Sequence, residues 1–312
     1  MSNLIKGAVF FSCFLPSFTN IGYKSRQLFW RKDNWDFSGQ RWIVTGATSG
    51  IGLEIARQAY NAGAQVHVVS RSAEKLATLH DSIGRDVVTH QADLSLMAEV
   101  KAVAEQLPEA DVLVNNVGLM LNTYTETREG LEQSFATNVL GHYVLTETLR
   151  DKGALNNGLI INMSSGGMYN VPMTLPLLQG DERFNGMLTY AYQKRAQVLL
   201  NSWWRKQGLN SYVMHPGWVD TPGVVTAMPE FHKMTRSILR EPPAGADTAL
   251  WLAANKPDQL HERGIWFDRG LRGDHYFSDT RTGSDEHQLI DYLEAALQGT
   301  SAATDTQASN AA

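Results

Sequence analysis

A glycine-rich turn, Thr45-Gly-Ala-Thr-Ser-Gly-Ile-Gly52, follows a short apolar run at residues 41–45 and precedes a helical apolar pattern at residues 51–62. A strand that ends, turns sharply and enters a helix needs glycine where a side chain would block the turn, a phosphate or the helix–strand contact. The N-terminus of the helix behind the turn favours the negative charge of a phosphate. The turn therefore predicts a strand–helix unit that binds a dinucleotide.

Strand-like and helix-like segments alternate through the middle of the chain. Further apolar runs predict strands at 65–69, 87–90, 111–115, 158–162, 210–214 and 264–268. Helical spacing predicts helices at 74–83, 130–149, 189–206 and 244–254. Such alternation gives a parallel sheet covered on both faces, with right-handed crossovers. The fold class is therefore α/β, a single doubly wound Rossmann-type domain with a seven-stranded, mostly parallel sheet and helices on both faces.

The two ends of the chain differ from this core. No Pro/Gly/Ser-rich linker divides residues 38–297, which are expected to form one domain. Residues 1–37 form an N-terminal extension whose stretch from Gly7 to Tyr23 carries no charge. That stretch is too short and too interrupted by polar residues to span a bilayer. It is expected to pack on the domain, and contact with a membrane surface is the alternative. Residues 298–312 are expected to be a disordered tail.

Composition excludes several classes of function. The formal net charge is -5, and no long basic run accompanies it, which argues against nucleic acid as a partner. A single cysteine, Cys13, excludes an internal disulfide framework and a cysteine-cluster metal site. The nine histidines show no metal-ligand spacing. We expect no metal and a reducing, cytoplasmic compartment, peripheral to a membrane if the N-terminal extension contacts one.

A tyrosine and a lysine, Tyr190 and Lys194, lie four residues apart within the helical pattern at 189–206 and therefore share one face of that helix. A nearby positive charge favours the phenolate and lowers the pKa of a tyrosine. A tyrosine tuned in this way can donate or accept a proton near neutral pH. With a nicotinamide to carry the hydride, the pair indicates carbonyl reduction or alcohol oxidation.

The spacing Thr-Gly-x-x-x-Gly-Ile-Gly of the turn, together with Tyr-x-x-x-Lys, resembles the short-chain dehydrogenase/reductase family. Asn115-Asn-Val-Gly118, Phe135-Ala-Thr-Asn138, Ile161-Asn-Met-Ser-Ser165 and His215-Pro-Gly-Trp-Val-Asp-Thr221 resemble further motifs in the family's order. The resemblance implies that Tyr190 and Lys194 form the proton-transfer pair and that Ser165, rather than Ser164, hydrogen-bonds the substrate oxygen. It also implies that Asn138 belongs to a water relay behind Lys194. His142 is expected to be a packed helix residue.

Ser165 and Tyr190 are 25 positions apart, longer than the usual family spacing. A similar insertion occurs in retinol-dehydrogenase-like members. Ser165-Gly-Gly-Met168 and the long His215 segment are similar to the group called dehydrogenase/reductase member twelve. Loops at about 166–188 and 223–243 are expected to cover the nicotinamide. Apolar side chains in and beside them suit a small apolar carbonyl or alcohol as substrate; they are Met168, Tyr169, Met173, Leu175, Trp218, Met228 and Phe231.

The end of the second predicted strand bears on the choice of cofactor. An acidic residue there would accept the 2′-hydroxyl of NAD, but this chain has Ser70-Arg71. Arginine can bind a 2′-phosphate through charge-assisted hydrogen bonds, which favours NADP(H) over NAD(H). The alternative is that Arg71 only caps the strand or is solvated. The residues expected to bind the cofactor are Gly46, Thr48, Ser49, Gly50, Ile51, Gly52, Ser70, Arg71, Asp93, Leu94, Asn116, Gly118, Tyr190, Lys194, Pro216, Gly217, Val219 and Thr221.

The function expected from these features is an NADP(H)-dependent oxidoreductase that interconverts an apolar aldehyde or ketone and its alcohol, with Tyr190 as general acid/base. One alternative is a dinucleotide-binding sensor or scaffold without turnover, and a less favoured one is an epimerase or dehydratase. The resemblance also implies a homo-oligomer, formed through the helices at 130–150 and 189–207.

Overall fold

The computed structural model describes residues 12–310 except 13, 32, 182 and 259–263, and it describes side chains through Thr300. Cys13 therefore lies outside the described residues. The described residues form an eight-stranded sheet in the order β3-β2-β1-β4-β5-β6-β7-β8. The strands are β1 Arg41–Thr45, β2 Gln65–Ser70, β3 Val88–Gln91, β4 Val112–Asn115, β5 Leu159–Met163, β6 Asn210–Met214, β7 Ile265–Phe267 and β8 Gly270–Arg272.

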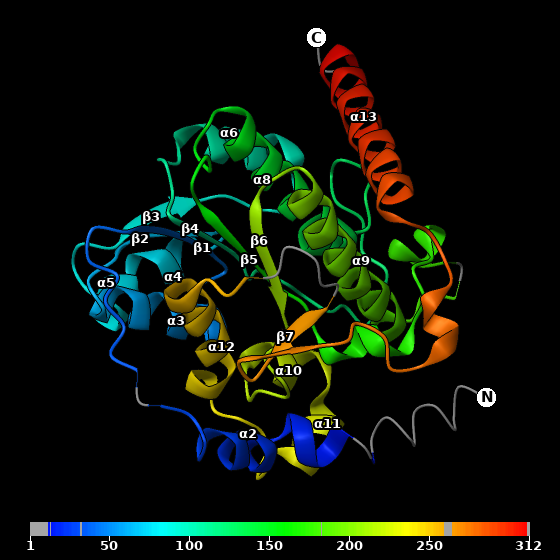
Figure 1. The fold of residues 1–312 in the computed structure, drawn as a ribbon. Helices are drawn as coiled ribbons and strands as arrows, with labels where there is room; N and C mark the ends of the chain where they lie inside the picture. Colours follow the sequence, from blue (N-terminus) through cyan, green and yellow to red (C-terminus); the bar gives the residue numbers. More distant parts are fainter. Residues whose placement is uncertain (1–11, 13, 32, 182, 259–263, 311–312) are drawn as a thin grey trace.

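Helices cover both faces of this sheet, as the alternation predicts (Figure 1). On one face, α6 Met97–Gln106, α8 Gly141–Asp151 and α9 Gly186–Lys206 enclose an apolar cluster that includes Ile43 and Leu113. On the other face, α3 Gly50–Asn61 packs against α12 Pro242–Asn255 over Val44 and Val66. Neighbouring residues of one strand, such as Ile43 and Val44, thus enter different clusters because side chains alternate across a sheet. The parallel doubly wound class is confirmed.

The remaining helices are short, apart from the last one. They are α2 Asn20–Gln27, α4 Ala73–Ala77, α5 Leu79–Ser82, α7 Gln133–Phe135, α10 Pro222–Ala227 and α11 Pro229–Thr235. Turns of 3-10 helix span Gly166–Asn170, Leu175–Leu178 and Ser278–Arg281. The last helix, α13 Glu286–Asn310, runs through most of the segment that composition predicts to be disordered. Its backbone is helical where the sequence is rich in alanine, the residue that favours helix most.

The sheet has one strand more than the sequence predicts, because the strand expected at 264–268 ends early. Asp268 and Arg269 both adopt positive φ values, 47° and 58°, and form a two-residue hairpin turn into β8. β8 runs antiparallel to β7 at the edge of the sheet. The turn places the Asp268 carboxylate against a buried arginine, Arg240.

The described part of the N-terminal extension packs on the domain, beside α11 in Figure 1. Phe18 is 2% exposed and contacts Met168, Val213 and Phe267 in a third apolar cluster. Its carbonyl oxygen accepts hydrogen bonds from the backbone N–H of Trp218 at 2.9 Å and from Nε of Arg240 at 2.7 Å. None of the described helices has both the length and the apolar character needed to cross a bilayer. Contact with a membrane surface stays a prediction.

A buried ion pair holds this extension in place. The Arg240 guanidinium, whose side chain is fully buried, contacts both Asp268 carboxylate oxygens at 2.5 and 2.9 Å, and it also donates to the Ser17 carbonyl. Arg26 of α2 reaches the same carboxylate at 2.6 Å. Asp268 therefore joins the extension, the loop before α12 and the β7–β8 turn.

We expect Asp268→Asn to destabilise the protein by about 3–5 kcal/mol, because it leaves the buried Arg240 charge without a counter-ion. The free energy of unfolding in urea measures the loss. Asp151→Asn is the matched control: Asp151 pairs with Arg150 at the surface, where its side chain is 67% exposed, and its loss should cost less than about 1 kcal/mol. Equal losses in the two variants would contradict the expectation.

Candidate active site

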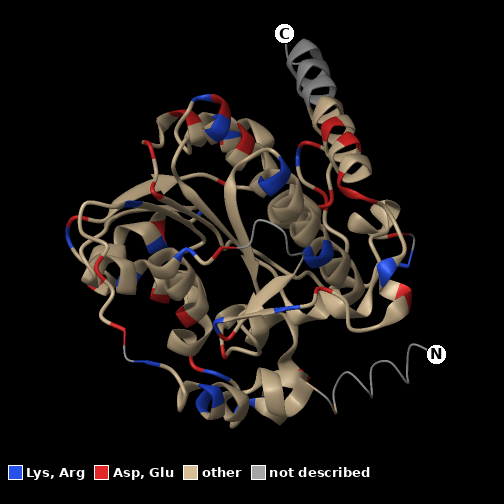
Figure 2. Cartoon of the chain, in the orientation of Figure 1, with Lys and Arg blue, Asp and Glu red and all other residues tan. Residues whose placement is uncertain are grey.

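The residues predicted to bind the cofactor gather at one edge of the sheet. The carboxyl ends of β1, β4, β5 and β6 lie there, because parallel strands end on the same side. Unlike the buried strands, most of these residues are half-buried, and Arg71 and Gly118 are exposed. In Figure 2 the positions of the charged residues concentrate on the helices and loops around the sheet. The strands therefore provide a largely uncharged frame for the few polar groups at this edge.

The glycine turn has the shape that its sequence predicts. Gly46 and Gly50 have φ values of +66° and +57°, which residues other than glycine rarely adopt. A Cβ atom on Gly52 would lie 2.3 Å from Nδ2 of Asn116, so this glycine allows α3 to approach the strand ends. The Ser49 side chain forms no hydrogen bond that caps α3. The first N–H groups of α3 are therefore available to an anion, and the turn fits a dinucleotide phosphate.

Asn116 binds the turn to the neighbouring strand. Its Nδ2 donates to the carbonyl oxygen of Thr45 at 2.8 Å, and its backbone N–H donates to Oγ1 of the same threonine at 3.0 Å. The Asn115–Gly118 segment is thus attached directly to the end of β1.

The positions that would face the adenosine end of a dinucleotide follow β2 and β3. Ser70 ends β2, and the side chain of Arg71 forms no ion pair with any described residue. Oδ1 of Asp93 accepts hydrogen bonds from the backbone and the hydroxyl of Ser95 at 2.9 and 2.8 Å. Leu94 is buried. Asp93 therefore shapes its own loop, whereas the Arg71 guanidinium is available to an anion.

The structure brings Ser165, Tyr190 and Lys194 together. Ser165 follows β5 and hydrogen-bonds the half-buried Tyr190 near the start of α9. Ser164 instead donates its hydroxyl to the carbonyl oxygen of Lys194 at 2.7 Å and is 4% exposed. Nζ of Lys194 lies 5.3 Å from the centroid of the Tyr190 ring. Of the two serines, the one that faces the tyrosine is Ser165.

Electrostatics at the pair differ from the expectation based on sequence. Burial raises the pKa of Tyr190 to about 12, and the hydrogen bond with Ser165 opposes this rise. Burial also lowers the pKa of Lys194 to about 7, because an ammonium with little access to water is disfavoured. Desolvation therefore outweighs the attraction between the two groups in the protein alone, and Tyr190 is a neutral phenol.

Asn138 lies in a single π-helical turn, Ala136–Leu140, which interrupts the helix expected at 130–149. Such turns occur often at functional sites. Its Nδ2 donates to the Leu119 carbonyl and to Oε1 of Gln193, both at 2.7 Å, and its Oδ1 accepts from the backbone of Leu119 at 2.8 Å. Its side chain therefore bonds to protein groups, and a role in a water relay stays a prediction.

The segment from Pro216 to Thr221 lies opposite the glycine turn. Gly217 has a φ of +77°, and the Pro216 carbonyl accepts a hydrogen bond from Arg240 at 3.2 Å. Val219 is buried, and the Thr221 hydroxyl caps α10. A Cβ atom on Gly50 would lie 3.2 Å from the Thr221 methyl group. The residues just before the covering loop expected at 223–243 therefore touch the glycine turn.

The loops expected to cover the nicotinamide are built partly from core residues. Met168, Tyr169 and Met173 are at most 5% exposed and pack in the interior. Trp218 lies edge-to-face between Phe18 and Phe231, with ring centroids 5.9 and 5.3 Å away. Met168, Tyr169 and Met173 thus support the loop after Ser165 from beneath. Phe18 of the N-terminal extension, which the sequence analysis did not assign to the site, packs directly beneath Gly166.

Sequence analysis also missed Gln193 and Gln197, which lie on the Tyr190 and Lys194 side of α9. Both are at most 1% exposed, and both connect to Asn138 through hydrogen bonds. Polar residues at helical spacing on a buried helix face were the signal that could have identified them.

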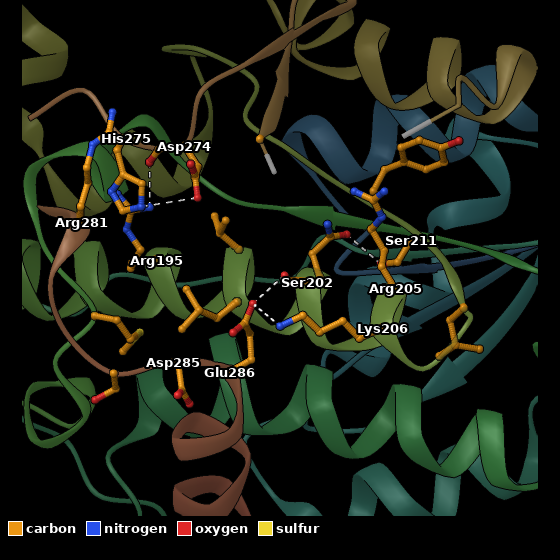
Figure 3. A pocket seen from close by; sticks show the side chains of 18 of the residues that line it. Arg195, Ser202, Arg205, Lys206, Ser211, Asp274, His275, Arg281, Asp285 and Glu286 are labelled. Atoms are coloured by element: carbon orange, nitrogen blue, oxygen red, sulfur yellow. Dashed lines mark hydrogen bonds and ion pairs between the residues drawn. The ribbon is translucent and has the colours of Figure 1, made fainter. Parts of the chain in front are cut away.

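A separate cavity of about 720 Å³ lies on the other side of α9 (Figure 3). It is lined by Arg195, Ser202 and Lys206 of α9, by Asp274 and His275, and by residues 280–286. Arg195 donates to the Asp274 carbonyl at 2.7 Å, and Glu286 contacts Ser202 and Lys206. Ser165, Tyr190 and Lys194 are not among its lining residues. The cavity is therefore distinct from the candidate active site.

Comparison with known proteins places this geometry in a family context. The family model described as short chain dehydrogenase matches residues 40–176. Dehydrogenase/reductase SDR family member 12 of Bos taurus is 34% identical over 310 residues, with 93% of this chain and 97% of that protein covered. Retinol dehydrogenase 11 of Homo sapiens is 30% identical, over 68% of this chain and 71% of that protein.

Solved structures share the fold. A short-chain dehydrogenase from Sphingobium yanoikuyae in complex with NADPH aligns with a TM-score of 0.53 at 24% identity, covering 68% of this chain and 84% of that one. A 3-ketoacyl-(acyl-carrier-protein) reductase from Brucella melitensis complexed with NADH aligns with a TM-score of 0.55 at 23% identity, covering 71% and 93%.

The buried lysine should make stability depend on pH. The folded-state pKa of Lys194 is about 7 and its ordinary value is 10.5, so the unfolded chain holds the proton more tightly between these values. Wild-type stability therefore gains a contribution as pH rises through this window. We expect Lys194→Met to be more stable than wild type at pH 7, with the difference shrinking toward pH 10. Urea unfolding at several pH values measures this, and a pH-independent difference would contradict it.

Proposed function

The chain belongs to the short-chain dehydrogenase/reductase family, and on that premise we propose that it is an NADP(H)-dependent oxidoreductase that interconverts an apolar carbonyl compound and its alcohol. The observation that carries the proposal is the convergence of Ser165, Tyr190 and Lys194 at the same carboxyl end of the sheet as the uncapped N-terminus of α3. Relatives named as dehydrogenases or reductases support the reaction class. Structures of the same fold solved with NADH or NADPH support a nicotinamide cofactor.

The residues divide the work of the reaction. A bound nicotinamide dinucleotide supplies or accepts the hydride. In reduction, the Tyr190 hydroxyl donates its proton to the carbonyl oxygen as negative charge develops there, and its neutral form is the one that the structure favours. Ser165, hydrogen-bonded to Tyr190, orients the same oxygen. Lys194 supplies positive charge beside the phenol, which stabilises the phenolate left after proton transfer.

Substrate and cofactor preference rest on the surroundings of this centre. Trp218, within the Pro216–Thr221 segment, packs edge-to-face against Phe231, and these aromatic groups suit an apolar substrate. The exposed Arg71 guanidinium at the end of β2 supports a 2′-phosphate and thus NADP(H). Assembly into a homo-oligomer stays a prediction.

Tyr190→Phe should lower kcat for NADPH oxidation with apolar aldehydes, ketones or quinones by at least about a hundredfold, because the variant lacks the transferable proton. Cofactor fluorescence should show that the variant still binds NADPH, weakened by no more than about tenfold, because only one hydroxyl group is lost from the cofactor site. Tight NADPH binding by the wild type without turnover across a broad panel would instead favour a sensor or scaffold.

Arg71→Ala should weaken NADPH binding much more than NADH binding, by about tenfold or more, because only NADPH carries the 2′-phosphate. Titration of both cofactors into wild type and variant measures the two dissociation constants. Lys75→Ala, an exposed position on α4, is the matched control for a general loss of positive charge. Equal weakening of NADPH and NADH by Arg71→Ala would overturn the assignment.

A further inference from the structure

The Lys194 ammonium is buried without a carboxylate partner. Its side chain belongs to a residue that is 2% exposed, and no ion pair between described residues includes it. Nζ donates instead to two neutral oxygens, the Met163 carbonyl at 2.8 Å and Oε1 of Gln197 at 3.2 Å. A buried charge needs such partners to remain charged. Gln197 is the only side chain among the described residues that accepts a hydrogen bond from Nζ.

Gln197 is held in one orientation by its other contacts. It lies nearly one turn after Lys194 on α9 and is 1% exposed. Its Nε2 donates to the Asn138 carbonyl at 2.7 Å and lies 3.2 Å from Nδ1 of His142. Rotating the amide by half a turn would point its N–H groups at the ammonium and its oxygen at the carbonyl. The network therefore directs Oε1 to Lys194.

His142 completes this orientation from α8. It is 1% exposed, and its Nε2 lies 2.9 Å from the Val117 carbonyl, which can only accept a hydrogen bond. Nε2 must therefore carry the proton, and Nδ1 is left to accept from Gln197. Burial and the Lys194 charge lower the pKa of His142 to about 3, so the ring stays neutral at physiological pH. Each polar group in the series of hydrogen bonds from Lys194 through Gln197 and His142 to Val117 has a complementary partner.

We propose that Gln197 is a positioning residue that, supported by His142, holds the Lys194 ammonium beside Tyr190 and sets the pH range in which that ammonium is charged. The inference rests on the proposed function, because it assigns Lys194 the task of stabilising the Tyr190 phenolate. Gln197 touches neither substrate nor cofactor in this proposal.

The titratable groups that face Lys194 are few. Tyr190 lies one turn before it on α9, and His142 faces it from α8. The strand β5 and the loop after β4 contribute the neutral groups of Met163, Ser164 and Gly118. Changes at Gln197 should therefore act directly on the titration of Lys194, with Tyr190 and His142 as the two titratable neighbours that can couple to it.

Two substitutions should move this titration in opposite directions. Gln197→Leu removes the acceptor and should lower the pKa of Lys194 by about one unit. Gln197→Glu replaces it with a negative acceptor and should raise that pKa by about one unit or more. Packing damage alone would not produce shifts of opposite sign. The pKa is measured in the cofactor-free protein by the ¹³Cε NMR signal of Lys194, assigned with Lys194→Met.

Gln193→Leu is the matched control. Gln193 is a fully buried glutamine of the same helix that also contacts Asn138, since its Oε1 accepts a hydrogen bond from Asn138 Nδ2. Its Nε2 donates to Glu132, Ser134 and Leu178, and none of these hydrogen bonds involves Lys194 or Gln197. Its substitution should leave the Lys194 titration within about 0.3 units. If Gln197→Leu does not fold, Gln197→Glu decides alone: an unchanged or lowered pKa overturns the proposal.

Kinetic measurements then test the role of Gln197 separately from the proposed function. In a wild type that reduces carbonyl compounds, the pH profile of kcat should shift with the NMR pKa in each variant. Shifts of the same sign in both Gln197 variants, or a profile that does not follow them, would overturn this inference alone. If the two Gln197 variants shift the Lys194 pKa in opposite directions but the wild type shows no turnover, the proposed function is overturned. The link from Gln197 to catalysis then falls with it.

Discussion

The common direction of the strands is the constraint on which the candidate site depends. The strands β1, β4, β5 and β6 are parallel, so their carboxyl ends lie on the same side of the sheet. Their last residues there are Thr45, Asn115, Met163 and Met214. At two of these strand ends, the main-chain carbonyl oxygens of Thr45 and Met163 accept hydrogen bonds from side chains. Asn116 and Lys194 use them: one donates to Thr45, the other to Met163. The site is therefore assembled largely from strand ends, with α9 as the helix that brings the reactive side chains.

Two buried cations show different solutions to the same problem. Arg240 is fully buried and is paired with the Asp268 carboxylate, which Arg26 also contacts. Lys194 is buried among neutral oxygens, and the pKa of its ammonium falls to about 7. A carboxylate counter-ion favours the charged form of a buried cation at neutral pH. Neutral acceptors favour it less, so the pKa of the cation can fall close to neutral pH. The first arrangement suits a structural joint, and the second suits a group that takes part in proton chemistry.

The N-terminal extension packs against the domain that follows it in the sequence. It lies outside residues 40–176, which the family model matches, yet Phe18 packs beneath Gly166 and binds the backbone of Trp218. The loop after Ser165 and the segment after β6 thus share a support from a distant part of the sequence. A domain boundary drawn at Ser38 from composition alone separates residues that pack together.

The sequence by itself determined the alternating α/β order, the glycine turn and the helical pair Tyr190 and Lys194, because each depends on spacing along a few neighbouring residues. It also indicated Ser165 through its place at a strand end. Only the tertiary structure decided that Asp268 turns the chain into an eighth strand, that Phe18 supports the site, and that Gln197 and His142 meet Lys194. These relations join residues up to 242 positions apart, as Arg26 and Asp268 are. No local pattern records them, because they arise from burial and hydrogen-bond complementarity after the elements have packed.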